Sequence, residues 1–449
     1  MNLLAQADAL RLPFPSDHFH IIVTSPPYFG LRSYEVAPRV WGGDPACDHE
    51  WKTIVKSAAN GIVNSEMSGE TLSGDSATRK PTFSSGCSKC DAWLGCLGLE
   101  PTLDLYLDHM VAICREFRRV LRPDGSFWLN IGDSYNGSGG AGGDYGPGGS
   151  REGQARYPGR NLSRGKRIPR GSGRWGLESN AGDAVLKRKD LLMIPARLAI
   201  ALCEDGWWLR SEIIWSKGNV MPSSALDRPT RSHEQVYLFA KSEHYFYDVY
   251  AVLQPLADST ARDGRFRRAP LEATTEVGRR LRSVWTVPTG SYSGDHSASY
   301  PPELIEPMIL AGTSAKGVCP VCGAPWKRLV KRTKHPSRDM EEQRASAALR
   351  TGRADGYVPG PEGKLDEVRT VGWTRTCQHE GEPVPASVLD PFCGTGTTGM
   401  VCRELGRNFV GVDLSWSYLN SEARVRALRQ TPQHKIDELP LFAGMADET

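Results

Sequence analysis

The stretch SVLDPFCGTGTTGMVCRELGRNFVGVDLS (Ser387–Ser415) decides the fold. It opens with a short apolar strand, passes through a glycine-rich turn into the helical segment TTGMVCREL, and ends on a second apolar strand, NFVGVD. Strand, turn, helix and strand in this order are typical of a parallel α/β sheet. Gly394 and Gly396 permit the tight turn, and their missing side chains let a ligand approach the helix N-terminus.

Asp413 ends the second of these strands. A carboxylate at that position can accept hydrogen bonds from both hydroxyls of a ribose. Because the turn lacks the dinucleotide fingerprint, the spacing favours a nucleoside without phosphates, such as S-adenosylmethionine. An ordinary strand-to-helix turn remains the alternative that the spacing alone leaves open.

A second informative stretch, FHIIVTSPPYFG, lies near the N-terminus. Its apolar, β-branched residues Phe19–Val23 predict a buried strand of a parallel sheet. Pro26 and Pro27 cannot donate backbone hydrogen bonds, so the strand must end there. The sequence therefore predicts either a plain rigid loop or a ligand-binding loop at the carboxyl end of a strand.

The remaining periodic segments support the same fold class. Further α/β elements are predicted at Thr102–Leu121 (helix), Pro123–Gly125 (turn), Ser126–Asp133 (strand), Leu191–Cys203 (helix), Trp207–Trp215 (strand) and Gln235–Lys241 (strand).

The bulk composition narrows the class of protein. The chain has 449 residues, 39% hydrophobic and 24% charged, with a net charge of +3, which predicts a globular protein of several domains or one domain with insertions. No apolar run of about 18 residues and no secretory signal are present, so we expect a cytoplasmic protein without a membrane span. Its eleven cysteines would then be mostly reduced thiols, able to bind metal.

Taken together, TSPPY near the N-terminus and DPFCGTGTTG near the C-terminus resemble the motifs of DNA amino-methyltransferases. Placing the catalytic loop first and the cofactor loop last resembles the permuted order of the beta group. Three further blocks resemble this family: ADAL (Ala7–Leu10), WSKGNVMPSSALDRPTRSHEQVYLFAKS (Trp215–Ser242) and HSASYPPELIEPMILAGT (His296–Thr313). The resemblance implies an α/β, class I S-adenosylmethionine-dependent methyltransferase fold, circularly permuted, with a Rossmann-like mixed, mostly parallel sheet.

The resemblance implies roles for the tetrapeptide at Ser25–Tyr28. An exocyclic amine is a poor nucleophile because its lone pair is delocalised into the ring. The Ser25 hydroxyl and the Pro26 carbonyl would accept hydrogen bonds from that amine, with the loop geometry fixed by Pro26 and Pro27. Tyr28 would stack on the extruded base. Serine in the first position favours N4 of cytosine in duplex DNA, and N6 of adenine is the alternative.

The family's cofactor site carries over residue by residue. Phe392 would lie against S-adenosylmethionine, Gly394 and Gly396 would admit its methionine part, and Asp390 would lie near its amino acid end. Asp413 would bind the ribose, and Asp8 in ADAL would approach the adenine. The full expected set is Asp8, Asp390, Pro391, Phe392, Gly394, Gly396, Thr397 and Asp413.

Cysteine and histidine residues form two sets with a shared pattern, a C-x-x-C and a C-x-H. The candidate ligands are Cys47, His49, Cys87 and Cys90 in the first set, and Cys319, Cys322, Cys377 and His379 in the second. Three thiolates and one imidazole complete a closed tetrahedral zinc site. We therefore expect one or two structural zinc ions in zinc-ribbon-like insertions outside the catalytic blocks. Loose cysteines in loops are the alternative.

Two basic segments are candidates for contact with DNA phosphates. From Gly137 to Gly176, 14 of 40 residues are glycine, which predicts a mobile arm, and Arg262–Arg282 holds seven arginines against three acidic residues. The candidate DNA-binding residues are Arg151, Arg156, Arg160, Arg164, Lys166, Arg167, Arg170, Arg262, Arg265, Arg267 and Arg268.

These assignments divide the chain into segments. We expect a catalytic half of the core (1–44), a zinc-binding insertion (45–97), a core strand–helix–strand (98–136), a Gly/Arg-rich arm (137–186), more core (187–245), a target-recognition region (246–285), a core helix (286–316), a second zinc-binding insertion (317–382), the cofactor-binding half (383–430) and a tail (431–449). The resemblance also admits a cognate restriction endonuclease as a partner. Rival functions are methylation of RNA or of a protein glutamine, and an inactive zinc-stabilised DNA-binding protein.

Overall fold

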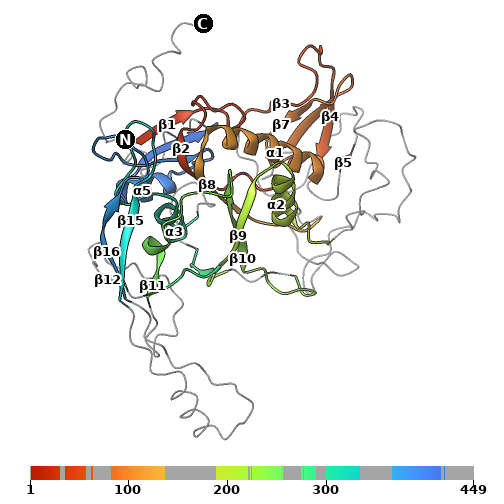
Figure 1. Cartoon of the computed structure of the whole chain (residues 1–449). Coiled ribbons are helices and arrows are strands. Elements are labelled where there is room, and N and C mark those ends of the chain that lie inside the picture. Colours follow the sequence, from red (N-terminus) through yellow and green to blue (C-terminus); the bar gives the residue numbers. More distant parts are fainter. Residues whose placement is uncertain are drawn as a thin grey trace, which may run out of the picture.

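An eight-stranded sheet forms the centre of the computed structural model (Figure 1). The structure describes residues 2–30, 36–56, 62–63, 82–136, 189–220, 223, 225–255, 275–276, 278–289, 300–333, 367–415 and 419. In spatial order the strands are β1 (Asn2–Gln6), β18 (Asn408–Asp413), β17 (Ser387–Asp390), β2 (Phe19–Thr24), β8 (Leu121–Ile131), β10 (His233–Ala240), β9 (Trp208–Ser216) and β14 (Val284–Thr286). Neighbouring strands are parallel except around β10, which runs antiparallel to β8 and β9.

The sheet joins the two ends of the chain. β17 pairs in parallel with β2, placing Val388 opposite Ile21 and Leu389 opposite Ile22. The loops after these two strands therefore leave the same edge of the sheet, although they come from opposite ends of the sequence. A mixed sheet with one antiparallel strand in this permuted order confirms the predicted class I methyltransferase fold.

Helices cover both faces of the sheet (Figure 1). On one face pack α1 (Leu103–Val120) and α2 (Ile194–Glu204); on the other pack α3 (Pro302–Gly312) and α5 (Thr397–Glu404), with the short 3-10 helix η1 (Val249–Val252) beside α3. In β2, Phe19 and Ile22 face the first layer while Ile21 and Val23 face the second. Apolar side chains on both faces explain why this strand reads as a continuous hydrophobic run.

The connection between α1 and β8 differs from the sequence prediction. The strand begins at Leu121, and the turn predicted at Pro123–Gly125 is instead a bulge within it. Leu121 pairs with Phe19 and Ser126 pairs with Ile21, so the four residues between them lie opposite His20 alone. The backbone is extended there, and the extra residues are accommodated by irregular pairing.

Two smaller antiparallel sheets flank the core on opposite sides (Figure 1). The first, beside α1, contains β3 (Arg39–Trp41), β7 (Trp93–Gly95), β6 (Thr82–Cys87), β4 (Trp51–Lys56) and β5 (Ile62–Val63). The second contains β12 (Thr275–Glu276), β16 (Glu367–Thr374) and β15 (Lys327–Thr333). Separately, β11 (Gln254–Pro255) pairs with β13 (Gly278–Arg279) in a two-stranded sheet. β12 belongs to the expected target-recognition region and β15–β16 to the second expected insertion, so these two regions share a sheet.

Several predicted features lie outside the described residues: the Gly/Arg-rich arm (137–186), the basic residues 262–268 and the tail (431–449). Within the described ranges, no helix combines the length and apolar character needed to cross a membrane.

Candidate active site

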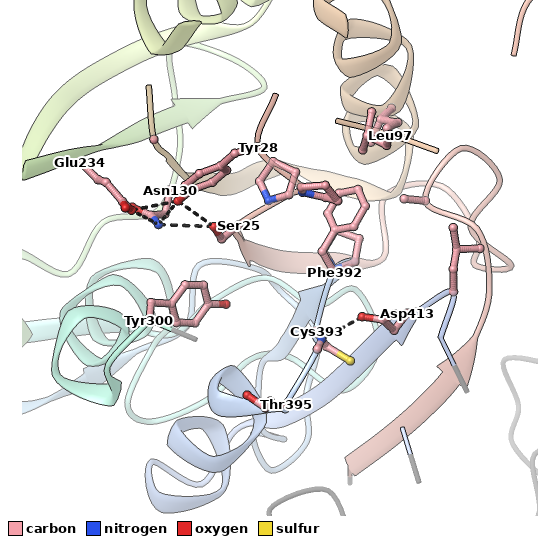
Figure 2. Close-up of a pocket in the computed structure, with 18 of the residues that line it drawn as sticks. Ser25, Tyr28, Leu97, Asn130, Glu234, Tyr300, Phe392, Cys393, Thr395 and Asp413 are labelled. Carbon is pink, nitrogen blue, oxygen red and sulfur yellow. Dashed lines mark hydrogen bonds between the residues drawn. The ribbon is translucent and has the colours of Figure 1, made fainter. Parts of the chain in front are cut away.

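A cavity of about 450 Å³ opens where the loops after β2 and β17 meet (Figure 2). Every predicted catalytic and cofactor-binding residue lines it except Asp390 and Gly396. The structure thus brings the Ser25–Tyr28 loop and the Pro391–Thr397 loop to one hollow, as expected for strands that end at a common edge.

The glycine-rich turn adopts the conformation for which glycine is suited. Gly394 has φ +45° and Gly396 has φ +73°, both in the left-handed region. A Cβ on Gly394 would meet no protein atom within 4 Å, so it would project into open space. Gly396 precedes α5, which begins at Thr397.

Asp413 closes this turn from the end of β18. Its carboxylate accepts the Gly394 N–H at 3.0 Å and the Ser415 N–H at 2.9 Å. Burial raises the pKa of the Asp413 carboxyl, and these backbone donors oppose that shift. The carboxylate therefore holds the turn and also lines the cavity.

Asp390 lies beneath the cavity floor and is fully buried. Burial raises the pKa of its carboxyl. Four groups donate to it: the hydroxyls of Thr24 (2.7 Å), Thr398 (2.6 Å) and Tyr300 (2.8 Å), and the Phe392 N–H (3.2 Å). The residue therefore fixes the cofactor turn to the catalytic strand, while Phe392 next to it reaches the cavity.

The other end of the cavity carries a polar network centred on Tyr28 (Figure 2). The Tyr28 hydroxyl donates to Glu234 Oε2 at 2.9 Å and accepts from Ser25 Oγ at 3.1 Å. Asn130 Nδ2 donates to the Tyr28 oxygen (2.8 Å) and to Glu234 Oε2 (3.1 Å). Lys217 forms an ion pair with the other oxygen of Glu234. Because the Ser25 hydroxyl donates to Tyr28, its oxygen can accept a proton donor from the cavity.

Packing also holds the catalytic loop. Tyr106 of α1 donates its hydroxyl to the Pro27 carbonyl at 2.9 Å. At Gly132, directly after β8, a Cβ would lie 2.5 Å from the Tyr28 ring, so only glycine leaves room for that ring. These contacts hold Pro27 and Tyr28, and Pro26 and Pro27 both line the cavity.

Asp8 lines the cavity shortly after β1, whose last residue, Gln6, pairs with Asp413. The Asp8 carboxylate accepts the Leu10 N–H at 2.9 Å and forms an ion pair with Arg39 of β3. The short ADAL segment is thereby tied to the first small sheet, a contact that the motif alone did not indicate.

Sequence reasoning missed several polar residues of this site, among them Asn130, Lys217, Glu234 and Tyr300. Asn130 could have been found from the sequence, because it is a polar residue within the apolar strand FWLNI. Lys217 and Glu234 lay inside a quoted block without an assigned role. They meet because β9 and β10 are neighbouring antiparallel strands.

The two cysteine–histidine sets each come together in space. In both, the four ligand atoms lie within 4.8 Å of one another. In the first set, Cys47 Sγ lies 3.9 Å from Cys87 Sγ, and Cys90 Sγ lies 3.4 Å from His49 Nδ1. Tetrahedral coordination with Zn–S bonds of about 2.3 Å separates two sulfurs by roughly 3.8 Å, so the donor geometry fits zinc.

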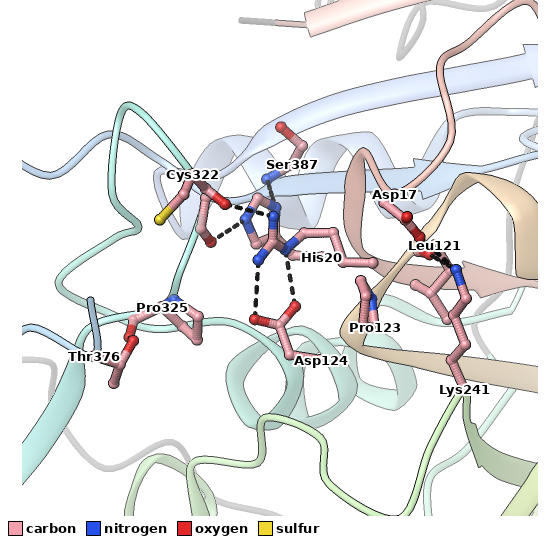
Figure 3. Close-up of polar contacts among 12 residues, drawn as sticks. Asp17, His20, Leu121, Pro123, Asp124, Lys241, Cys322, Pro325, Thr376 and Ser387 are labelled. Carbon is pink, nitrogen blue, oxygen red and sulfur yellow. Dashed lines mark hydrogen bonds and ion pairs between the residues drawn. The ribbon is translucent and has the colours of Figure 1, made fainter. Parts of the chain in front are cut away.

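The second set is attached to the amino-terminal edge of the sheet, where Cys322 lies near His20 and Ser387 (Figure 3). His20 Nε2 donates to the Gly323 carbonyl at 2.9 Å, and Arg122 donates to the Cys322 carbonyl at 2.8 Å. Arg122 is itself held by both carboxylate oxygens of Asp124. The second set is therefore joined to the core through the backbone carbonyls of Cys322 and Gly323, at the end of the C-x-x-C motif.

Comparison with known proteins agrees with this geometry. A family model described as DNA methylase (N6/N4 type) matches residues 19–319 and 383–424. The type II methyltransferase M.XycI of Xanthomonas campestris pv. cyanopsidis is 30% identical over 424 residues, covering 94% of this chain and 86% of that protein. M.Cfr9I of Citrobacter freundii is 30% identical over 419 residues (93% and 85%), and M.SmaI of Serratia marcescens is 31% identical over 336 residues (75% and 78%).

Among solved structures, the PvuII DNA methyltransferase (cytosine-N4-specific) aligns with a TM-score of 0.44 and 13% identity, covering 97% of this chain and 89% of that one. The family match spans most of the chain, and M.XycI and M.Cfr9I cover it nearly from end to end. The chain therefore belongs to the N6/N4 DNA methylase family, the S-adenosylmethionine-dependent amino-methyltransferases of DNA.

Proposed function

We propose that the protein transfers a methyl group from S-adenosylmethionine to N4 of cytosine in duplex DNA. The observation that carries this proposal is the hydrogen bond from Ser25 to Tyr28. The serine proton then points to Tyr28, and the serine oxygen, which accepts from Asn130 Nδ2 at 3.4 Å, has a second lone pair that can accept from an amine in the cavity. Together with the family resemblance, serine rather than aspartate at this position favours cytosine.

The base end of the cavity is built to hold an exocyclic amine. Ser25 Oγ and the Pro26 carbonyl accept its two protons, which favours a pyramidal nitrogen with a localised lone pair. Tyr106 and Gly132 keep the loop in one geometry, so the acceptors need no rearrangement when the amine arrives.

The cofactor end fits a nucleoside. The open space beside Gly394 admits a ligand against the backbone, Phe392 offers an apolar contact, and Asp413 offers acceptors for ribose hydroxyls. Asp8, which lines the same cavity, would approach the adenine. When bound, S-adenosylmethionine supplies an electrophilic methyl group on its sulfonium.

Recognition of duplex DNA requires the target base to leave the helix. A base stacked in a duplex cannot reach acceptors inside a cavity, so we propose that the cytosine is flipped and stacks on Tyr28. The basic residues of the arm and of the 262–268 segment are proposed to neutralise phosphates, which predicts a salt-dependent affinity. A cognate endonuclease stays a prediction from the type II relatives.

Both cysteine–histidine sets are proposed to bind structural zinc. Three thiolates and one imidazole are the donors of a closed zinc site, and their convergence in both sets supports this. Metal analysis of the purified protein tests the proposal, with an expected content of two zinc ions per chain.

The function is tested by nucleoside mass spectrometry of DNA from cells that make the protein, compared with cells that make Ser25→Ala. We expect N4-methylcytosine only with the wild-type chain. N6-methyladenine instead would keep the site but overturn the base assignment. If neither appears while the protein binds cofactor, duplex DNA is not the substrate and RNA is assayed next. Absence of cofactor binding would favour the inactive DNA-binding alternative.

A further inference from the structure

The first small sheet forms part of the cavity wall. Residues from its strands and flanking turns that line the cavity are Val36, Ala37, Arg39, Trp41, Cys96 and Leu97. Figure 2 shows Leu97 on the side of Phe392 and Asp413, away from Asn130 and Glu234. The ion pair between Arg39 and Asp8 links the same wall to ADAL. This sheet therefore faces the cofactor end of the cavity.

The wall is connected to the first cysteine–histidine set by a short path. Cys87 ends β6 and Cys90 lies in the turn before β7. Within that turn the Cys87 N–H donates to the Ala92 carbonyl at 2.8 Å, and β6 and β7 pair through Gly86 and Trp93. A change in the turn at Cys87–Cys90 would therefore displace β7, which leads directly into Cys96 and Leu97.

A stack of rings fixes β7 against α1. His109 packs against both Trp41 and Trp93, with ring centroids 4.4 Å and 5.5 Å away, and the two tryptophan rings lie 6.4 Å from each other. Trp41 Nε1 donates to the Gly95 carbonyl at 3.0 Å. His109 Nδ1 donates to the buried carboxylate of Glu100 at 3.0 Å. The two tryptophans thus transmit the position of the sheet to the segment that contains Gly95.

The same segment touches the catalytic loop. Glu100 accepts the Gly98 N–H at 2.8 Å, and the Gly98 carbonyl accepts the Gly30 N–H at 2.7 Å. A Cβ on Gly98 would lie 2.9 Å from the Tyr28 carbonyl oxygen, so the two backbones are in direct contact. The path from the first set therefore ends at both sides of the cavity.

The second set is attached to a different part of the fold: Val318, next to Cys319, pairs with Val384, which precedes the amino-terminal end of β17. Its contacts, His20 with Gly323 and Arg122 with Cys322, lie at the opposite edge of the sheet. Among the residues that the structure describes, none from the second set lines the cavity. The two sets have the same types of ligand, but they are attached to different parts of the fold.

We propose that metal bound by Cys47, His49, Cys87 and Cys90 sets the affinity of the cavity for cofactor, whereas metal bound by the second set only stabilises the fold. Among the side chains that the structure describes in these strands, the buried apolar ones are Trp41, Cys87 and Trp93, so metal supplies rigidity to a sheet of short strands. This inference rests on the proposed zinc and cofactor sites and assigns the two zinc ions different roles.

The test compares Cys90→Ser with Cys322→Ser in the full-length chain. Each variant should lose one zinc ion by elemental analysis. Calorimetric titration with S-adenosylhomocysteine should show affinity about tenfold or more weaker for Cys90→Ser, and within about twofold of wild type for Cys322→Ser. Unchanged affinity in Cys90→Ser, or equal losses in both variants, overturns the inference.

A second variant tests the inference in case Cys90→Ser does not fold. Leu97→Ala keeps every metal ligand and removes only a wall contact, so it should retain both zinc ions and still bind S-adenosylhomocysteine more weakly. Unchanged affinity in Leu97→Ala contradicts a cofactor-facing wall. If the wild-type chain binds no S-adenosylhomocysteine, the proposed function itself fails. If it binds the ligand but contains no zinc, only the inference fails.

Discussion

Thr24 and Asp390 stand 366 positions apart in the chain, yet the Thr24 hydroxyl donates to Asp390 Oδ1 at 2.7 Å. The bond joins the last residues of β2 and β17, which carry the catalytic loop and the cofactor loop. Both residues are almost completely inaccessible to solvent. The permuted halves of the chain are thus tied together directly beneath the cavity.

Thr24→Val is expected to destabilise the protein because it removes one donor from a buried carboxylate. Loss of a hydrogen bond to such a group costs about 1–3 kcal/mol. Urea unfolding should show this loss with an unchanged denaturant slope. Thr24→Ser keeps the hydroxyl and should retain most of the stability. Equal midpoints for wild type and Thr24→Val would show that the bond contributes nothing.

Glu234→Gln is expected to slow methyl transfer by on the order of 100-fold while leaving cofactor affinity unchanged. Glu234 accepts from Tyr28 and Lys217 through different oxygens. A glutamine has one oxygen and one amide nitrogen, so whichever way it turns, one of those donors faces another donor. Single-turnover methylation and calorimetry separate the two effects.

Glu212→Gln is the matched control for that experiment. Glu212 lies on the neighbouring strand β9, accepts from Tyr237 at 3.3 Å and does not line the cavity. It should methylate at the wild-type rate. If both glutamine variants lose activity equally, the effect belongs to the general charge balance and not to the Tyr28 network.

Much of the fold was predictable because its signals are local. The strand at Phe19–Val23 and the helix after Thr102 lie within one residue of where the apolar pattern placed them. Thr102 accepts the Leu105 N–H, as its N-cap position indicated. Such features depend on residues that are neighbours in sequence.

The missed parts depend on contacts between distant segments. The residues Pro123–Gly125 are of types that usually form a turn. Here they form a bulge within β8, whose pairing with β2 continues on both sides. The grouping of Asn130 with Glu234 arises only when β10 inserts antiparallel beside β8. Likewise, no spacing rule could place Leu97 of the first insertion at the cofactor end of the cavity.

Acid is expected to destabilise the protein through His20. Burial, aided by the nearby Arg122 charge, lowers the pKa of His20 from 6.5 to about 4. Ser387 N–H donates to Nδ1 at 3.1 Å, so the single ring proton must occupy Nε2, which donates to Gly323. Protonation of Nδ1 would break the bond to Ser387.

The sign of the effect follows from linkage. Between about pH 6.5 and about pH 4, His20 is protonated in the unfolded chain but neutral in the folded chain. The free energy of unfolding should therefore fall as the pH is lowered through this window, by at most on the order of 3 kcal/mol. His20→Gln cannot titrate, so its urea midpoint should change less between pH 7 and pH 5. Parallel midpoints for the two proteins would exclude His20 as the source.

Gly394→Ala is expected to weaken cofactor binding by more than its effect on folding explains. Gly394 and Gly406 both have positive φ, +45° and +67°, and a Cβ on either would meet no protein atom within 4 Å. Alanine at each position should cost about 1–2 kcal/mol of backbone strain. Only Gly394 lines the cavity, so only its methyl group occupies space that the cofactor needs. Calorimetry with S-adenosylhomocysteine should show weaker binding by Gly394→Ala and wild-type binding by Gly406→Ala. Equal affinities for the two variants would mean that the cofactor does not approach the backbone at this turn.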